Sequence, residues 1–174
     1  MAKETAFGGS NSYRALKAEG HQIGTSGDPH SVNKWAKRLL SDNPVELQQA
    51  SAVCYAISDV NPNLFQPFTA DIIMVIRKNV HDAGPRFGFR VLSEMNIQGE
   101  HLGEIIDVSF EALTKKSNPI AVKVFAMAVI GNHLGQFPDL GIELAAILKE
   151  DLPNSSAGYR SRAKKIIKKH NLSV

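Results

Sequence analysis

Apolar residues along this chain recur with the three- and four-residue spacing of helices that bury one face. The pattern predicts helices over residues 29–40, 44–58, 64–78, 85–97, 101–115, 119–133, 138–149 and 156–170. In the first of these, Trp35 falls on the apolar face, so we assign it to the core. Strand signals are weak, because valine and isoleucine are spaced for helices and no Asn-Gly or Asp-Gly hairpin turn occurs. The chain is therefore predicted to be all-α.

Prolines stand at the starts of several predicted helices, where a missing backbone N–H costs little. A capping side chain precedes three of them, at Asp28-Pro29, Asn43-Pro44 and Asn118-Pro119. Residues 119–131 read Pro-x-x-Val-Lys-x-x-Ala-x-x-x-Ile-Gly, and the units near Pro44, Pro85 and Tyr159 keep parts of this pattern. A repeat of roughly 35–45 residues predicts a helical solenoid.

This pattern resembles the first helix of a HEAT repeat, which reads proline, valine-arginine, alanine and leucine-glycine in the same order. The resemblance to the HEAT/armadillo-like helical repeat superfamily covers roughly residues 29–174. It extends to short bacterial HEAT-like proteins of unassigned activity. The resemblance implies an all-α, right-handed α-α superhelix, a HEAT-like solenoid of about four helix pairs. Fold resemblance of this kind says little about function.

The first 28 residues differ in composition from the rest of the chain. Five glycines, including Gly20 and Gly24, lie there among serine, threonine and asparagine. We interpret residues 1–28 as a flexible N-terminal extension with little regular structure, in which residues 13–19 could form a short helix. Residues 29–174 are then one helical repeat domain, a length that suits a single domain.

The composition of the chain indicates the cellular compartment in which the protein would fold. Cys54 is the single cysteine, so no internal disulfide is possible, and its apolar surroundings predict a buried thiol. The first 28 residues hold no apolar signal-peptide core, and the longest apolar run is far short of the ~20 residues of a membrane span. We expect a cytoplasmic protein without a membrane partner.

Positive charge is concentrated in the last predicted helix. The formal net charge is +3, yet the first 158 residues carry −3. The basic side chains are Arg160, Arg162, Lys164, Lys165, Lys168 and Lys169. Clustered cations could neutralise nucleic-acid phosphates, and the resemblance includes HEAT-like DNA alkylation-repair proteins, which hold duplex DNA in a basic groove. The alternative, which we favour, is a terminal capping helix with a polar outer face.

An acidic stripe is predicted on the helix over residues 101–115. Glu104, Asp107 and Glu111 fall on one face, three and four residues apart. Because second helices of HEAT pairs usually line the concave surface, the stripe is a candidate site for a basic protein or peptide. The alternatives are a solvated helix face and self-association of the stripe with the basic end of another copy. The sequence leaves the oligomeric state open.

Catalytic and cofactor motifs are not found in the sequence. No phosphate-binding loop or dinucleotide fingerprint occurs, and no two histidines have the spacing of a helical metal pair, so we assign no catalytic residue, metal or cofactor. The recurring basic position at Arg90, Lys123 and Arg160 is interpreted as a structural ladder with Asp42, Asp82 and Asn118. The sequence favours a non-catalytic scaffold or adaptor, with nucleic-acid binding as the alternative.

Overall fold

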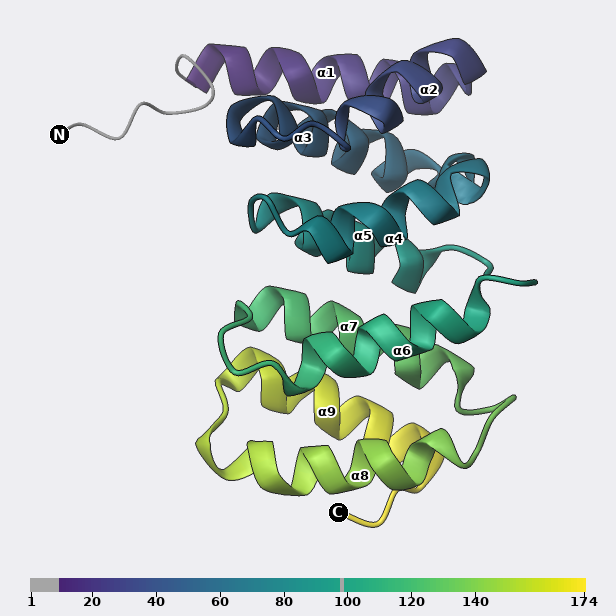
Figure 1. Ribbon diagram of the computed structural model, residues 1–174, viewed down its shortest axis with the longest axis vertical. Coiled ribbons are helices and arrows are strands. Elements are labelled where there is room, and N and C mark those ends of the chain that lie inside the picture. The colour runs from purple at the N-terminus through teal and green to yellow at the C-terminus, as the bar shows by residue number, and fades with distance from the viewer. Residues whose placement is uncertain (1–9, 98) are drawn as a thin grey trace, which may run out of the picture. The chain divides into compact units, whose positions relative to one another are not determined.

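The computed structural model describes residues 10–97 and 99–174, and all regular structure in these ranges is helical (Figure 1). This confirms the all-α prediction for the described chain. The helices form two compact units, Met1–His101 and Leu102–Val174, and each unit is described by itself.

The first unit is organised around one central helix. Its elements are α1 (Ser10–Ser26), α2 (Pro29–Arg38), α3 (Pro44–Val60), the 3-10 helix η1 (Pro62–Phe68), α4 (Thr69–Lys78) and α5 (Ala83–Glu94). Helix α3 packs against α1, α2, η1 and α5, and Figure 1 shows it between α1 and α5. Val53, Cys54 and Ile57 of α3 are fully buried. Trp35 is buried as predicted, and its indole N–H donates to Glu19 Oε1 over 2.9 Å.

The second unit is built around α7. Its elements are α6 (Leu102–Thr114), α7 (Ile120–His133), α8 (Leu140–Asp151), the 3-10 turn η2 (Leu152–Asn154) and α9 (Ala157–His170). Helix α7 packs against both α6 and α9. Leu113, Met127, Ile130, Leu144 and Leu148 form the centre of one apolar cluster, which buries their side chains from water.

Helix α1 was expected only as a short helix over residues 13–19. Residues 1–9 of the expected flexible extension lie outside the described residues, but Ser10–Ser26 form a helix against α3, so the expectation is wrong there. The glycines explain the error. A Cβ on Gly20 would lie 2.5 Å from the carbonyl oxygen of Val53, and one on Gly24 would lie 2.9 Å from that of Ile57. These glycines permit close packing of two helices and do not mark a loop.

Most predicted helices begin and end within three residues of the observed bounds, but the third differs in kind. Residues 64–78 were expected to form one helix, whereas a 3-10 helix runs to Phe68 and α4 begins at Thr69. Pro67 lies inside the predicted helix. Because proline has no N–H and crowds the preceding turn, it favours the short 3-10 segment there over continuous α-helix.

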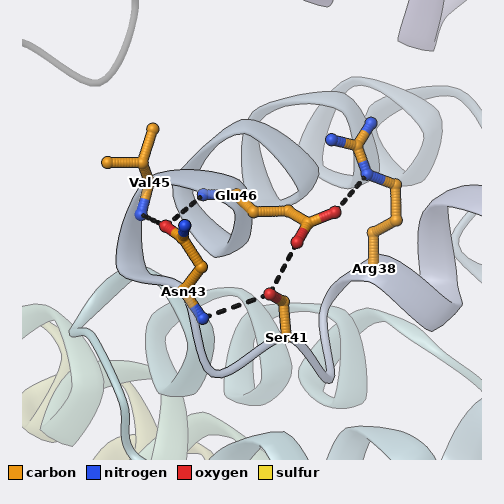
Figure 2. A network of polar contacts seen from close by, with 5 residues as sticks. All are labelled: Arg38, Ser41, Asn43, Val45 and Glu46. Atoms are coloured by element: carbon orange, nitrogen blue, oxygen red, sulfur yellow. Dashed lines mark hydrogen bonds and ion pairs between the residues drawn. The ribbon is translucent and has the colours of Figure 1, made fainter.

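The turn between α2 and α3 is held by a network of side chains (Figure 2). Asn43 caps α3, as predicted, because its Oδ1 accepts from the backbone N–H of Val45 over 2.9 Å and of Glu46 over 3.3 Å. Ser41 donates to Glu46 Oε2 over 2.7 Å, and Arg38 Nε donates to Glu46 Oε1 over 2.9 Å. The Glu46 carboxylate thereby ties the end of α2 to the start of α3.

The other two predicted caps have different outcomes. Asp28 caps α2 by accepting from the backbone N–H of Ser31 over 2.9 Å, as predicted. At α7 the capping residue is Pro119, without a side-chain cap, and the prediction for Asn118 is wrong. The Asn118 amide instead donates to the carbonyl oxygen of Ala112 over 2.9 Å, so it ties the turn back to α6.

We predict that Gly20→Ala lowers the free energy of unfolding by about 2 kcal/mol, because the added methyl group must push α1 away from α3. The control is Gly103→Ala in α6, where a Cβ would meet no atom within 4 Å. That change is expected to leave stability equal or higher by up to ~1 kcal/mol. Urea unfolding followed by circular dichroism measures both variants, and equal stability of the two would contradict the close contact.

We also predict a pH-dependent effect of Glu46→Gln. Hydrogen bonds from Ser41 and Arg38 hold the pKa of Glu46 below its usual value of 4.5. A carboxyl group with a lowered folded pKa stabilises the fold above its unfolded pKa, and this contribution disappears as the pH falls through the folded pKa. The stability difference between wild type and Glu46→Gln should therefore be largest near pH 6 and shrink below pH 4.5. Urea titrations at several pH values measure it, and Ser41→Ala should weaken the dependence.

Candidate binding surfaces

The acidic stripe lies on the exposed side of α6. Glu104, Asp107 and Glu111 are all exposed, whereas Ile105 and Leu113 of the same helix are fully buried. Helix α6 contains no lysine or arginine, so every charged side chain on this helix is acidic. The structure therefore gives the three carboxylates a common helix face of one charge sign, which suits a basic partner.

The basic residues lie on the outer side of α9. Arg160, Lys164, Lys165, Lys168 and Lys169 are exposed and Arg162 is half-buried. Tyr159, Ala163 and Ile166 point inward, as predicted. No carboxylate of the described chain forms an ion pair with any of the six cations. Their charge is therefore not offset by an acidic partner within the described residues.

The start of α9 is fixed by polar contacts that keep the basic face in place. The Ser156 hydroxyl oxygen caps the helix by accepting from the backbone N–H of Tyr159 over 3.3 Å. The Tyr159 hydroxyl donates to Asp151 Oδ2 over 2.8 Å. Burial, helped by Asp151, raises the pKa of Tyr159, so this hydroxyl stays protonated as a donor. The Arg160 guanidinium donates to the carbonyl oxygen of Ser155.

A third surface, which we did not identify from the sequence, is a cavity of about 590 Å³ over α3 in the first unit. We call it the α3 groove. Its floor is one face of α3, formed by Gln48, Ser51, Ala52, Tyr55 and Asp59, which recur every three or four residues. Its sides come from Tyr13 and Lys17 of α1 and from Ala83, Arg86 and Arg90 of α5, with His81 just before α5. The small side chains of Ser51 and Ala52 leave the hollow above the helix.

Charge in the α3 groove is mainly positive, with Lys17, Arg86 and Arg90 facing one carboxylate, Asp59. The Arg90 guanidinium binds Asp59, and its Nε donates to Glu94 Oε1 over 3.1 Å. Burial would lower the pKa of Arg90, but these two carboxylates together raise it above its usual value. Arg90 is therefore a permanent cation held in a fixed position.

Tyrosine and histidine side chains complete the α3 groove. The Arg90 guanidinium carbon lies 5.0 Å from the ring centroid of Tyr55. Burial raises the pKa of Tyr55, and a hydrogen bond from Arg86 partly offsets this effect. The backbone N–H of Ala83 donates to His81 Nδ1 over 3.1 Å, and the Gln48 amide contacts the other ring nitrogen. These contacts fix the shape of the groove walls.

The predicted structural ladder is wrong for Arg90. Its carboxylate partners are Asp59 and Glu94, and the expected ladder residue Asp42 instead pairs with Lys78 over 2.9 Å. The error came from assigning Arg90 by its repeat position alone. The sequence did contain a partial signal for the α3 groove, because polar residues recur along one face of the otherwise apolar helix at 44–58.

Three further features concern metal ligands, membrane-spanning helices and the single thiol of the described residues. That part of the chain holds no group of three or more His, Cys, Asp or Glu side chains placed to bind a metal ion. None of the helices in the described ranges has the length and apolar character needed to cross a lipid bilayer. Cys54 is fully buried, as predicted, and burial raises the pKa of its thiol, so it is a poor nucleophile.

Comparison with known proteins gives one match. A family model described as HEAT repeat domain matches residues 25–170. No curated protein matches the chain, and no solved structure matches it. The matched range includes every helix from α2 to α9 and confirms the predicted helical solenoid of repeats.

Proposed function

The chain belongs to the HEAT repeat family, and from this membership we propose that it is a non-catalytic scaffold or adaptor that binds a protein or peptide. HEAT repeats generally serve as protein-interaction scaffolds. Stacked helix pairs present long surfaces whose side chains vary freely, because the fold depends on the buried positions.

We assign the partner surface to the acidic face of α6. The observation that carries this proposal is the uniform charge of Glu104, Asp107 and Glu111 on a helix without a cation. A surface of one charge sign attracts a partner of the opposite sign and speeds its association. The partner is therefore a basic segment of another protein.

The test is fluorescence anisotropy with a labelled ten-residue peptide of alternating lysine and serine at low salt. The variant combines Glu104→Gln, Asp107→Asn and Glu111→Gln. Each exposed ion pair contributes up to ~1 kcal/mol, so we expect the Kd to rise about tenfold.

The matched control removes three exposed acids, by Asp139→Asn just before α8 and by Glu143→Gln and Glu150→Gln within α8. The control is expected to keep the Kd within about twofold, because the total charge changes equally while the α6 face is intact. An equal loss of affinity in the two triple variants would show that total charge, and not the α6 face, attracts the peptide.

A second candidate function, nucleic-acid binding, is favoured by one observation, the absence of carboxylate partners for the α9 cations among the described residues. Replacing Lys164, Lys165, Lys168 and Lys169 by glutamine should abolish salt-dependent binding of labelled duplex DNA or RNA. Anisotropy titrations at two salt concentrations measure this. The control replaces four exposed lysines elsewhere, Lys34, Lys115, Lys116 and Lys149. If the unmodified protein fails to bind at low salt, α9 is a capping helix.

A further inference from the structure

The α3 groove has the dimensions of a site for an extended peptide. From Gln48 to Asp59 the floor follows three turns of α3, about 16 Å of helix rise. A peptide strand advances about 3.3 Å per residue, so about five residues would span the floor. Helix α3 lies between α1 and α5 (Figure 1). Residues of both flanking helices therefore line the groove along this length.

The charge of the α3 groove selects for an acidic ligand. Lys17 lies on the α1 side and Arg86 on the α5 side, and neither has a carboxylate partner in the described part of the chain. Arg90 is held in place by Asp59 and Glu94. Guanidinium groups bind carboxylates through two parallel hydrogen bonds, which favours carboxylate side chains at defined spacing.

An unpartnered hydroxyl group lies on the floor. Ser51 is 2 % exposed, and its Oγ is buried without a hydrogen-bond partner in the described structure. A buried polar atom without a partner is uncommon and costs free energy. Because Ser51 lines the groove, a ligand lying on the floor would supply the missing carbonyl or carboxylate oxygen.

The aromatic rings favour a peptide over a nucleic acid. The Lys17 ammonium lies 5.5 Å from the centroid of the Tyr13 ring, and Arg90 covers Tyr55. The Phe87 and Tyr55 rings also pack edge to face, with their centroids 5.4 Å apart. Single-stranded nucleic acids bind by stacking bases on open aromatic faces, and here cations occupy a face of each ring.

We propose that the α3 groove binds an extended acidic segment of a partner protein, with its carboxylates on Lys17 and Arg86 and its backbone on Ser51. This site shares no residue with the surfaces on α6 and α9. A negative result for the α3 groove would therefore not affect the tests of the α6 and α9 surfaces. Negative results for α6 and α9 would likewise not affect the test of the groove.

The experiment is fluorescence anisotropy with a labelled octapeptide of alternating glutamate and serine, compared with the same peptide carrying glutamine for glutamate. Lys17→Gln and Arg86→Gln should each raise the Kd about tenfold, the usual loss for one charge-assisted hydrogen bond. Ser51→Ala should weaken binding without lowering the urea midpoint, because it removes a hydroxyl that has no partner in the unbound protein.

The matched control is Arg14→Gln, which removes an exposed cation from α1 outside the groove and should keep the Kd within about twofold. Equal binding of the glutamine peptide, or an equal effect of Arg14→Gln, would overturn the proposal. Displacement of the peptide by free glutamate at the same carboxylate concentration would assign the groove to a small anion. Tighter binding of a single-stranded oligonucleotide would assign it to nucleic acid. An unaltered urea midpoint shows that a groove variant is still folded, so that its weaker binding reflects lost contacts with the peptide.

Discussion

The packing of α3 against its neighbours is the interaction on which the first unit depends. Ala50, Val53, Cys54, Ala56 and Ile57 are all fully buried, since α1, α2, η1 and α5 each cover part of this helix. A helix that is apolar nearly all round is stable only when surrounded in this way. Polar residues of α3 form the floor of the α3 groove, so the same packing that holds the unit together also frames its candidate site.

Stability and binding are linked through the close approach of α1. Gly20 and Gly24 remove the side chains that would hold α1 off α3. Lys17 lies one helical turn before Gly20, and the close contact therefore brings its ammonium group to the edge of the floor. A bulkier residue at Gly20 would move the helix and the cation together. A change that destabilises this contact would also alter the groove.

The sequence predicted what local pattern determines and failed where distant contacts decide. Periodicity located most helices, and the Asn43 cap could be recognised because its hydrogen bonds are local. Gly20 and Gly24 were misread because loop glycines and helix-contact glycines look alike until the partner helix is known. The acidic face of α6 follows from the spacing of its residues along one helix. The α3 groove depends on the register of three helices, which spacing cannot provide.

The repeat architecture explains why family membership leaves function open. Gln48, Arg90, Lys123 and Arg160 occupy equivalent positions in the repeated units. Gln48 and Arg90 line the α3 groove, Lys123 lines a separate cavity in the second unit, and Arg160 donates to a carbonyl oxygen on its own turn. A repeat position fixes where a side chain leaves the backbone, whereas the neighbouring helices decide what it meets. Binding chemistry in this protein is therefore a property of neighbouring helix faces, and must be sought between repeats instead of within the repeat motif.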